Sequence, residues 1–171
     1  FGSSLKYAFC CPVLTHWVAV DDVASSGRQS QSATREVHMA ASVRRAIEQK
    51  IADADYYDAQ QMVKTVHRRL CSRGQHDAAA DFCVDSACKL AAAKEYDLAA
   101  NLGADLVDAF ASAKAAPSDE NLARIETLIA GIPSEAAVVP KYRVLNSALK
   151  WSAGSSQQGH PRLHRLSGGC S

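Results

Sequence analysis

A short signature that returns about every twenty residues constrains the fold of this chain more than any other feature. It stands at Tyr57-Asp58-Ala59, His76-Asp77-Ala78 and Tyr96-Asp97-Leu98, so the three aspartates are 19 and 20 residues apart. One helix and a tight connection need about twenty residues, and two of them make a hairpin that repeats roughly every 39 residues. We place each aspartate near a helix start, where its carboxylate offsets the positive end of the helix dipole.

Apolar residues at helical spacing support three helices that follow these signatures. Their apolar faces consist of Ala59, Val63, Val66 and Leu70, then Phe82, Cys83, Ala87 and Leu90, then Leu98, Leu102, Leu106 and Phe110. No segment alternates with a period of two, and alanine, the strongest helix former, is abundant. The sequence therefore predicts an all-α fold, an α-solenoid of antiparallel helix hairpins of the TPR-like kind.

Helices are also expected before and after these three. Val43, Ile47 and Ile51 mark a shorter helix ahead of them, and the glycine of 72–75 ends the first of the three. The segment 117–120 begins a helix that ends before Gly131 and Pro133. Further helices are expected from Pro140 to Trp151 and from Pro161, with His160 as the N-cap of the last.

The two ends of the chain lack the helical periodicity of the segment between them. Residues 1–38 contain an apolar run, 7–20, that is too short to span a membrane, and then a polar stretch without periodicity. We interpret Met39 as the natural initiator and 1–38 as a disordered or non-native extension, and a signal peptide is the alternative. The solenoid is expected over 39–166, interrupted inside its repeat, with a disordered tail at 167–171.

The net charge of +1 provides no field that would indicate nucleic acid. Six cysteines occur without any Cys-x-x-Cys pair, so we expect reduced thiols in a cytosolic protein rather than a disulfide framework or a zinc ribbon. We expect no direct insertion into a membrane.

The one pattern that resembles a catalytic site is His160-Pro-Arg-Leu-His164. Two histidines four residues apart can bind zinc on a helix, but Pro161 stands where the metalloprotease motif requires Glu. A capping role for His160 is the preferred interpretation, and a metal-dependent hydrolase that uses His160 and His164 is the alternative. We expect no enzyme activity, no cofactor and no metal.

Basic residues outnumber acidic ones from Met39 to Gln75. The basic set comprises Arg44, Arg45, Lys50, Lys64, Arg68, Arg69 and Arg73. At 100° per residue, Lys64 and Arg68 fall opposite the apolar face that contains Val63. The sequence thus predicts a basic docking surface for an acidic protein, and a solvated helix face or a generic helical-repeat module is the alternative.

Several separated blocks resemble the Golgi to ER traffic protein 4 family, and plant or algal members most. The blocks are Asp55-Tyr-Tyr-Asp-Ala-Gln-Gln-Met62, Leu106-Val-Asp-Ala-Phe110, Asp119-Glu-Asn-Leu-Ala-Arg-Ile125, Ala148-Leu-Lys-Trp-Ser-Ala153 and Gly159-His-Pro-Arg-Leu-His164. The resemblance covers roughly 41–165, the N-terminal half of a typical member.

This resemblance implies a cytosolic α-solenoid that acts as a scaffold in guided entry of tail-anchored membrane proteins into the endoplasmic reticulum. It implies that the N-terminal half docks on the homodimeric targeting ATPase. Candidate docking residues are Lys64, Arg68, Arg45 and Asp108, and the resemblance connects Asp108 with ATP hydrolysis. In the family the C-terminal half binds a ubiquitin-like partner, and we expect that half to be missing from this sequence.

Overall fold

The computed structural model describes residues 29–154 and 158–168. The chain divides into two units, Phe1–Met39 and Ala40–Ser171. Helix α1 (Gln29–Ala52) crosses this division, so the described part of the first unit is helical backbone.

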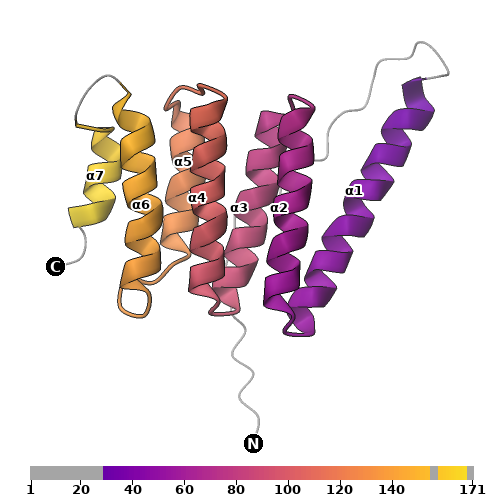
Figure 1. Ribbon diagram of the computed structural model, residues 1–171, viewed down its shortest axis with the longest axis horizontal. Coiled ribbons are helices and arrows are strands. Elements are labelled where there is room, and N and C mark those ends of the chain that lie inside the picture. Colours follow the sequence, from indigo (N-terminus) through magenta and orange to yellow (C-terminus); the bar gives the residue numbers. More distant parts are fainter. Residues whose placement is uncertain (1–28, 155–157, 169–171) are drawn as a thin grey trace, which may run out of the picture. The chain divides into compact units, whose positions relative to one another are not determined.

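Six further helices follow within the second unit (Figure 1). They are α2 (Tyr56–Ser72), α3 (His76–Ala92), α4 (Tyr96–Ser112), α5 (Asp119–Ala130), α6 (Val138–Ala153) and α7 (Pro161–Gly168). The described residues contain no strand, and the prediction of an all-α fold is confirmed. Asp58, Asp77 and Asp97 each lie in the first turn of a helix, as the repeat predicted.

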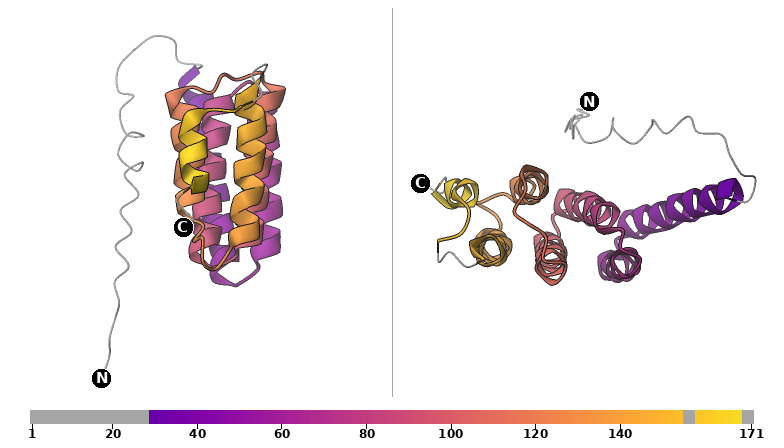
Figure 2. Two further views of the ribbon diagram at one scale, coloured as in Figure 1. Left: turned by 90° about the vertical axis from the view of Figure 1, so that its left-hand side faces the viewer. Right: turned by 90° about the horizontal axis from the view of Figure 1, so that it is seen from above.

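The helices of the second unit lie in two rows. Seen from above, α2, α4 and α6 form one row and α3, α5 and α7 form the other (Figure 2). Neighbours along the chain run antiparallel, so the members of one row are parallel to each other (Figure 1). We call the row of α2, α4 and α6 the front row, because it faces the viewer in Figure 1.

The core lies between the two rows. Apolar side chains with an exposed fraction of 2% or less come from both rows and include Val63, Leu90, Leu102, Leu128 and Val144. Burying one such side chain stabilises a fold by about 1.5–3 kcal/mol. The predicted faces of α3 and α4 are buried in this core except for Leu98, which is partly buried, so helical periodicity identified the core side of these two helices.

The connection between consecutive helices is the same tight turn four times. A residue with a positive φ follows each of the helices α1 to α4, and a backbone N–H then bonds a carbonyl of the last turn, as from Gln75 N to Leu70 O at 3.0 Å. Gly74 supplies the left-handed residue once, as predicted, but Ala54, Lys94 and Lys114 do so elsewhere. A positive φ costs more free energy at these three residues than it would at a glycine. The packing of the hairpins must therefore hold the turn in this conformation.

The predicted boundaries of three helices require correction. Helix α6 spans Val138–Ala153 rather than Pro140 to Trp151. Helix α1 begins at Gln29 rather than near Met39, so the backbone of 29–38 is helical although its sequence lacks periodicity. Helix α7 continues through Ser167 to Gly168 instead of stopping at Leu166. Residues 1–28 and 169–171 lie outside the described part, and Met39 as initiator stays a prediction.

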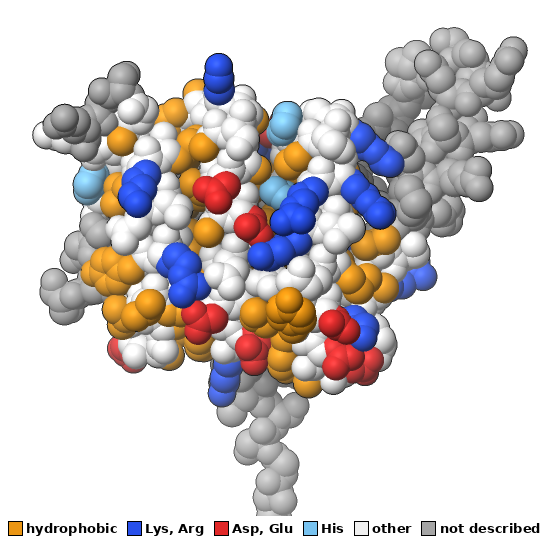
Figure 3. Space-filling model, in the orientation of Figure 1, with side chains coloured by type: hydrophobic (Ala, Val, Ile, Leu, Met, Phe, Trp, Pro, Cys, Tyr) orange, Lys and Arg blue, Asp and Glu red, His pale blue; other side chains and the backbone are white. Residues whose placement is uncertain are grey.

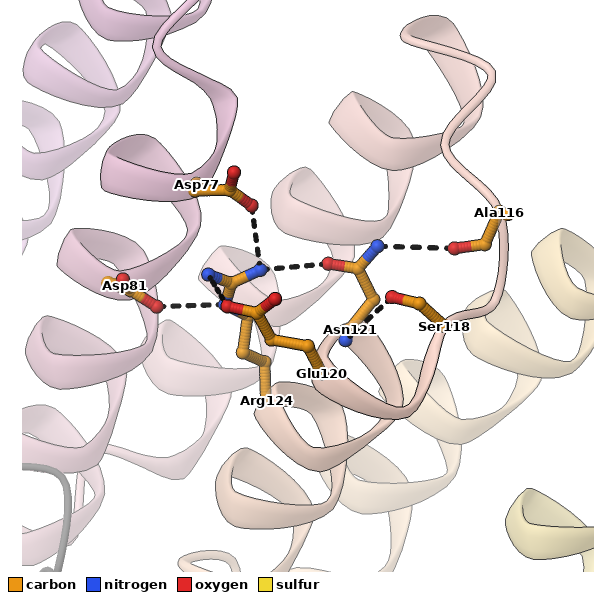
Figure 4. A network of polar contacts seen from close by, with 7 residues as sticks. All are labelled: Asp77, Asp81, Ala116, Ser118, Glu120, Asn121 and Arg124. Carbon is orange, nitrogen blue, oxygen red and sulfur yellow. Dashed lines mark hydrogen bonds and ion pairs between the residues drawn. The ribbon is translucent and has the colours of Figure 1, made fainter.

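An arginine connects α3 and α5, two neighbouring helices of the row that contains α3, α5 and α7 (Figure 4). The guanidinium of Arg124 on α5 bonds Asp81 at 2.8 Å and Asp77 at 3.0 Å, both on α3, and Glu120 at 2.9 Å on its own helix. Burial opposes the charged form, but the hydrogen bond that Arg124 donates to Asp81 and the charges of the surrounding carboxylates raise the pKa of Arg124. Ser118 caps the same helix by accepting from Asn121 N at 3.3 Å.

Candidate partner-binding face

The front row presents a face on which charged side chains of both signs gather over α2 and α4 (Figure 3). An ion pair joins these two helices, with Lys64 Nζ 3.1 Å from Asp105 Oδ2. The Oδ2 atom of Asp105 is buried, and the Lys64 ammonium is the charged group that lies against it. A buried carboxylate oxygen is costly when it has no partner, so the charge of Lys64 stabilises Asp105 at this place.

Lys64 is less accessible than the sequence predicted. Its side chain is 22% exposed and is held between α2 and α4, whereas Arg68 is exposed as expected. A helical wheel assumes one buried face, but a helix within a row has a second covered side where its parallel neighbour packs. Lys64 points to that second side.

The other candidate residues fall in two places. Arg68 lies one turn beyond Lys64 on α2, and Asp108 lies one turn beyond Asp105 on α4. Because the two helices are parallel, the exposed Arg68 and Asp108 share one face at one level. Arg45 is exposed on α1, beside an arginine that bonds α3. The structure therefore brings Lys64, Arg68 and Asp108 together and places Arg45 on a different helix.

Beneath this charged face lie groups that the sequence did not single out. His67 is 6% exposed, and its Nε2 is 3.8 Å from Cys71 Sγ. Burial lowers the pKa of His67, Asp105 works against this shift, and Arg68 adds to it. Burial also raises the pKa of the Cys83 thiol to about 12, so this thiol is not a nucleophile.

The buried imidazole predicts a pH-dependent stability. Below its ordinary pKa of 6.5, His67 takes up a proton in the unfolded chain but resists it in the folded one. The free energy of unfolding is therefore expected to be full above that pKa and to fall as the pH drops from about 7.5 to about 5.5. Urea denaturation across this range is expected to show a smaller loss for His67→Gln. The exposed His76, replaced in the same way, is the matched control, and an unchanged profile for His67→Gln would contradict the argument.

Ion pairs between helices that are two apart in the chain follow the hairpin period. Lys64 and Asp105 are separated by 41 residues. The same separation holds for Lys89 with Glu48, at 2.6 Å, and for Arg44 with Asp85, at 3.1 Å. One hairpin returns the chain to the same level of the same row, so a charge meets its partner about forty residues on. The repeat length was thus the signal that could have predicted Asp105.

The two histidines of the hydrolase alternative serve the start of α7. Nδ1 of His160 accepts a hydrogen bond from the backbone N–H of Arg162 at 3.3 Å, which confirms the N-cap with Pro161 at the first helical position. Nε2 of His164 contacts the carbonyl oxygen of Gln158. In the described part of the chain, no three His, Cys, Asp or Glu side chains gather as metal ligands would.

The three cysteines in the described part of the chain form no disulfide with one another. Cys83 is buried, and Cys71 and Cys88 are half-buried. Cys10, Cys11 and Cys170 lie outside the described residues. No helix in the described ranges combines the length and the apolar character needed to cross a bilayer.

Paired antiparallel helices, a core between two rows and a charged front face together define a helical-repeat protein of the α-solenoid class. Comparison with known proteins gives the family. The family model described as Golgi to ER traffic protein 4 matches residues 73–170. The chain belongs to the Golgi to ER traffic protein 4 family.

Individual relatives agree with this assignment. The Golgi to ER traffic protein 4 homolog of Homo sapiens is 31% identical over 120 residues, which cover 68% of this chain and 35% of that protein. Golgi to ER traffic protein 4 of Schizosaccharomyces pombe is 29% identical over 110 residues, 64% of this chain and 36% of the relative. The chain thus spans about a third of the length of these relatives.

A solved structure supports the fold. The crystal structure of Get4 from C. therm. superposes with a TM-score of 0.66 at 20% identity, over 74% of this chain and 41% of that one. At this identity the likeness concerns the fold alone, and it confirms the prediction of a helical solenoid.

Proposed function

We propose that this chain is a non-enzymatic adaptor in the delivery of tail-anchored membrane proteins to the endoplasmic reticulum. In this proposal it works in the cytosol and docks on the homodimeric targeting ATPase. The observation that carries the proposal is membership of a family whose curated members are named traffic proteins, with 31% identity to the human homolog. The ubiquitin-like partner is proposed to bind outside the third of the relatives' length that this chain matches.

The α2/α4 face is the proposed ATPase-docking surface. Arg68 and Asp108 are exposed there, one turn beyond the pair of Lys64 and Asp105, and they offer a partner one charge of each sign. Exposed charges of this kind chiefly set the association rate and the salt dependence of binding. Lys64 contributes less directly, because Asp105 already neutralises it.

Charge reversal at Arg68 tests this surface. Arg68→Glu is expected to weaken binding to the nucleotide-loaded ATPase by roughly fivefold to tenfold at low salt, which is on the order of 1 kcal/mol. The difference should shrink as sodium chloride is raised, because salt screens exposed charges. Isothermal titration at two salt concentrations measures both effects.

Lys150→Glu is the matched control, since it makes the same charge change at an exposed position in the last turn of α6. It is expected to leave affinity within about twofold, as surface changes outside an interface do. Equal weakening by both variants would assign the effect to net charge and remove the docking surface from α2/α4. An absence of binding by the unmodified chain would favour the generic helical-repeat module.

A further inference from the structure

A cleft lies between the starts of α4 and α6, at one end of the front row. The turn before α4 and its first residues form one wall, and the segment that leads into α6 forms the other. The lining residues are Lys94, Glu95, Tyr96 and Asp97 on the first wall and 135–140 on the second. This place is separate from the charged pair of Arg68 and Asp108, which lies further along the helices.

Exposed apolar side chains concentrate at this cleft. Val138 and Val139 are 49% and 69% exposed, and Tyr142, one turn later on α6, is 38% exposed. Among the described residues, Tyr57 is the only other large hydrophobic side chain with comparable exposure. Three of the four exposed large hydrophobic side chains among the described residues thus lie on one short segment. On the same segment, Ala137 and Val144 are buried and contribute to the core. An apolar cluster that the fold itself does not use is typical of a binding surface.

The charges of the cleft favour a basic occupant. Glu95 and Glu135 form no ion pair within the described residues. Asp97 forms a weak ion pair, in which its Oδ1 atom lies 3.4 Å from Nη2 of Arg143. Lys94 is the single base in the lining. The nearby bases are already engaged, since Arg143 bonds Asn101 at 2.8 Å and Lys141 bonds Ser134 at 2.6 Å. Figure 3 shows red and orange side chains next to each other at the lower ends of α4 and α6.

We propose that the cleft between α4 and α6 binds a short basic segment of another protein, which places an apolar side chain against Val138 and Val139. Glu95 and Glu135 then attract the lysine or arginine side chains on either side of that anchor. A buried apolar contact with charges at its rim is the usual composition of a small protein interface. This surface is additional to the proposed ATPase-docking face.

A synthetic peptide probes the proposal. The probe is a fluorescein-labelled nonapeptide of alternating lysine and leucine, and fluorescence anisotropy measures its binding to the full chain. Two matched peptides replace lysine by glutamate or leucine by serine. The lysine–leucine peptide is expected to bind at least tenfold more tightly than either, and equal binding of the three would overturn the proposal.

Two variants locate the binding. Val139→Ser removes the apolar contact without a change of charge, and Glu135→Lys reverses one charge of the lining. Each is expected to weaken the lysine–leucine peptide at least fivefold. Both positions are exposed, so circular dichroism should show unchanged helix content. Asp53→Lys, the same charge change after α1, is expected to stay within twofold, and equal weakening there would overturn the proposal.

Self-association is the competing occupant. Sedimentation velocity of the chain without peptide is expected to show a monomer. A dimer that Val139→Ser dissociates would assign the cleft to a second copy of this chain and would overturn the proposal of a basic partner.

Discussion

Gly103→Val is expected to cost more than about 3 kcal/mol of unfolding free energy, since it forces a branched side chain into a filled space. Gly103 is buried in α4 where this helix meets α5 and α6. A Cβ at this position would lie 2.9 Å from Cγ2 of Val144 and 3.0 Å from Cδ2 of Leu128. Val144 has only one rotatable side-chain bond with which to give way, and the two extra methyl groups of valine add to the clash. Urea denaturation followed by circular dichroism measures the loss.

Gly103→Ala separates crowding from helix propensity. Alanine favours a helix interior by about 1 kcal/mol over glycine, which opposes the clash of its Cβ, so a net loss of about 1 kcal/mol is expected. Gly131→Ala is the matched control, because the nearest atom to its Cβ would be 3.4 Å away and its φ of −70° suits any residue. It should change stability by no more than about 0.5 kcal/mol. A Gly103→Val chain as stable as the original would show that α4, α5 and α6 do not pack as described.

Arg124→Ala is expected to cost about 2–3 kcal/mol. The arginine side chain is 8% exposed and bonds three carboxylates, so its removal leaves like charges from α3 and α5 facing each other. Asp77 and Glu120 are largely exposed, and water then screens them, which keeps the loss below that of a fully buried pair. Arg124→Lys keeps the positive charge but cannot form the several hydrogen bonds of the guanidinium. Its loss of unfolding free energy should therefore lie between those of the original chain and Arg124→Ala. Thermal and urea unfolding give the order of the three chains.

Arg143→Ala is the control for this prediction. Arg143 also joins two helices of one row through Asn101 and Asp97, but its side chain is 40% exposed. Exposed pairs contribute about 0–1 kcal/mol, so a loss of no more than about 0.5 kcal/mol is expected. Equal losses for Arg124→Ala and Arg143→Ala would show that burial does not set the strength of these bridges.

Local sequence determined the presence of the helices and the starts of most of them. Ser118 caps α5, His160 caps α7, and the aspartates of the repeated signature stand in first turns, as the chain pattern indicated. These features act over one or two turns, and the chemistry of a few neighbouring residues is sufficient for them. The family could be predicted for the same reason, because its blocks are continuous stretches of chain.

Parts of the candidate sites depended on contacts between distant segments. The partner of Lys64 is 41 residues away, and only the register of α2 against α4 makes it Asp105. Nothing in the sequence distinguishes Val138 and Val139 from apolar residues of the core. They remain exposed because α6 packs against the core with its other side.

The sequence by itself determined that this chain is an array of helix hairpins with a period of about forty residues, since helical periodicity and capping are local. The tertiary structure alone decided which charges stay available to a partner. Each helix of a row has two covered sides, one against the other row and one against its parallel neighbour. The register between parallel neighbours decides which side chains face the neighbouring helix. For this reason Arg68 stays accessible while Lys64, one turn away, is held by Asp105.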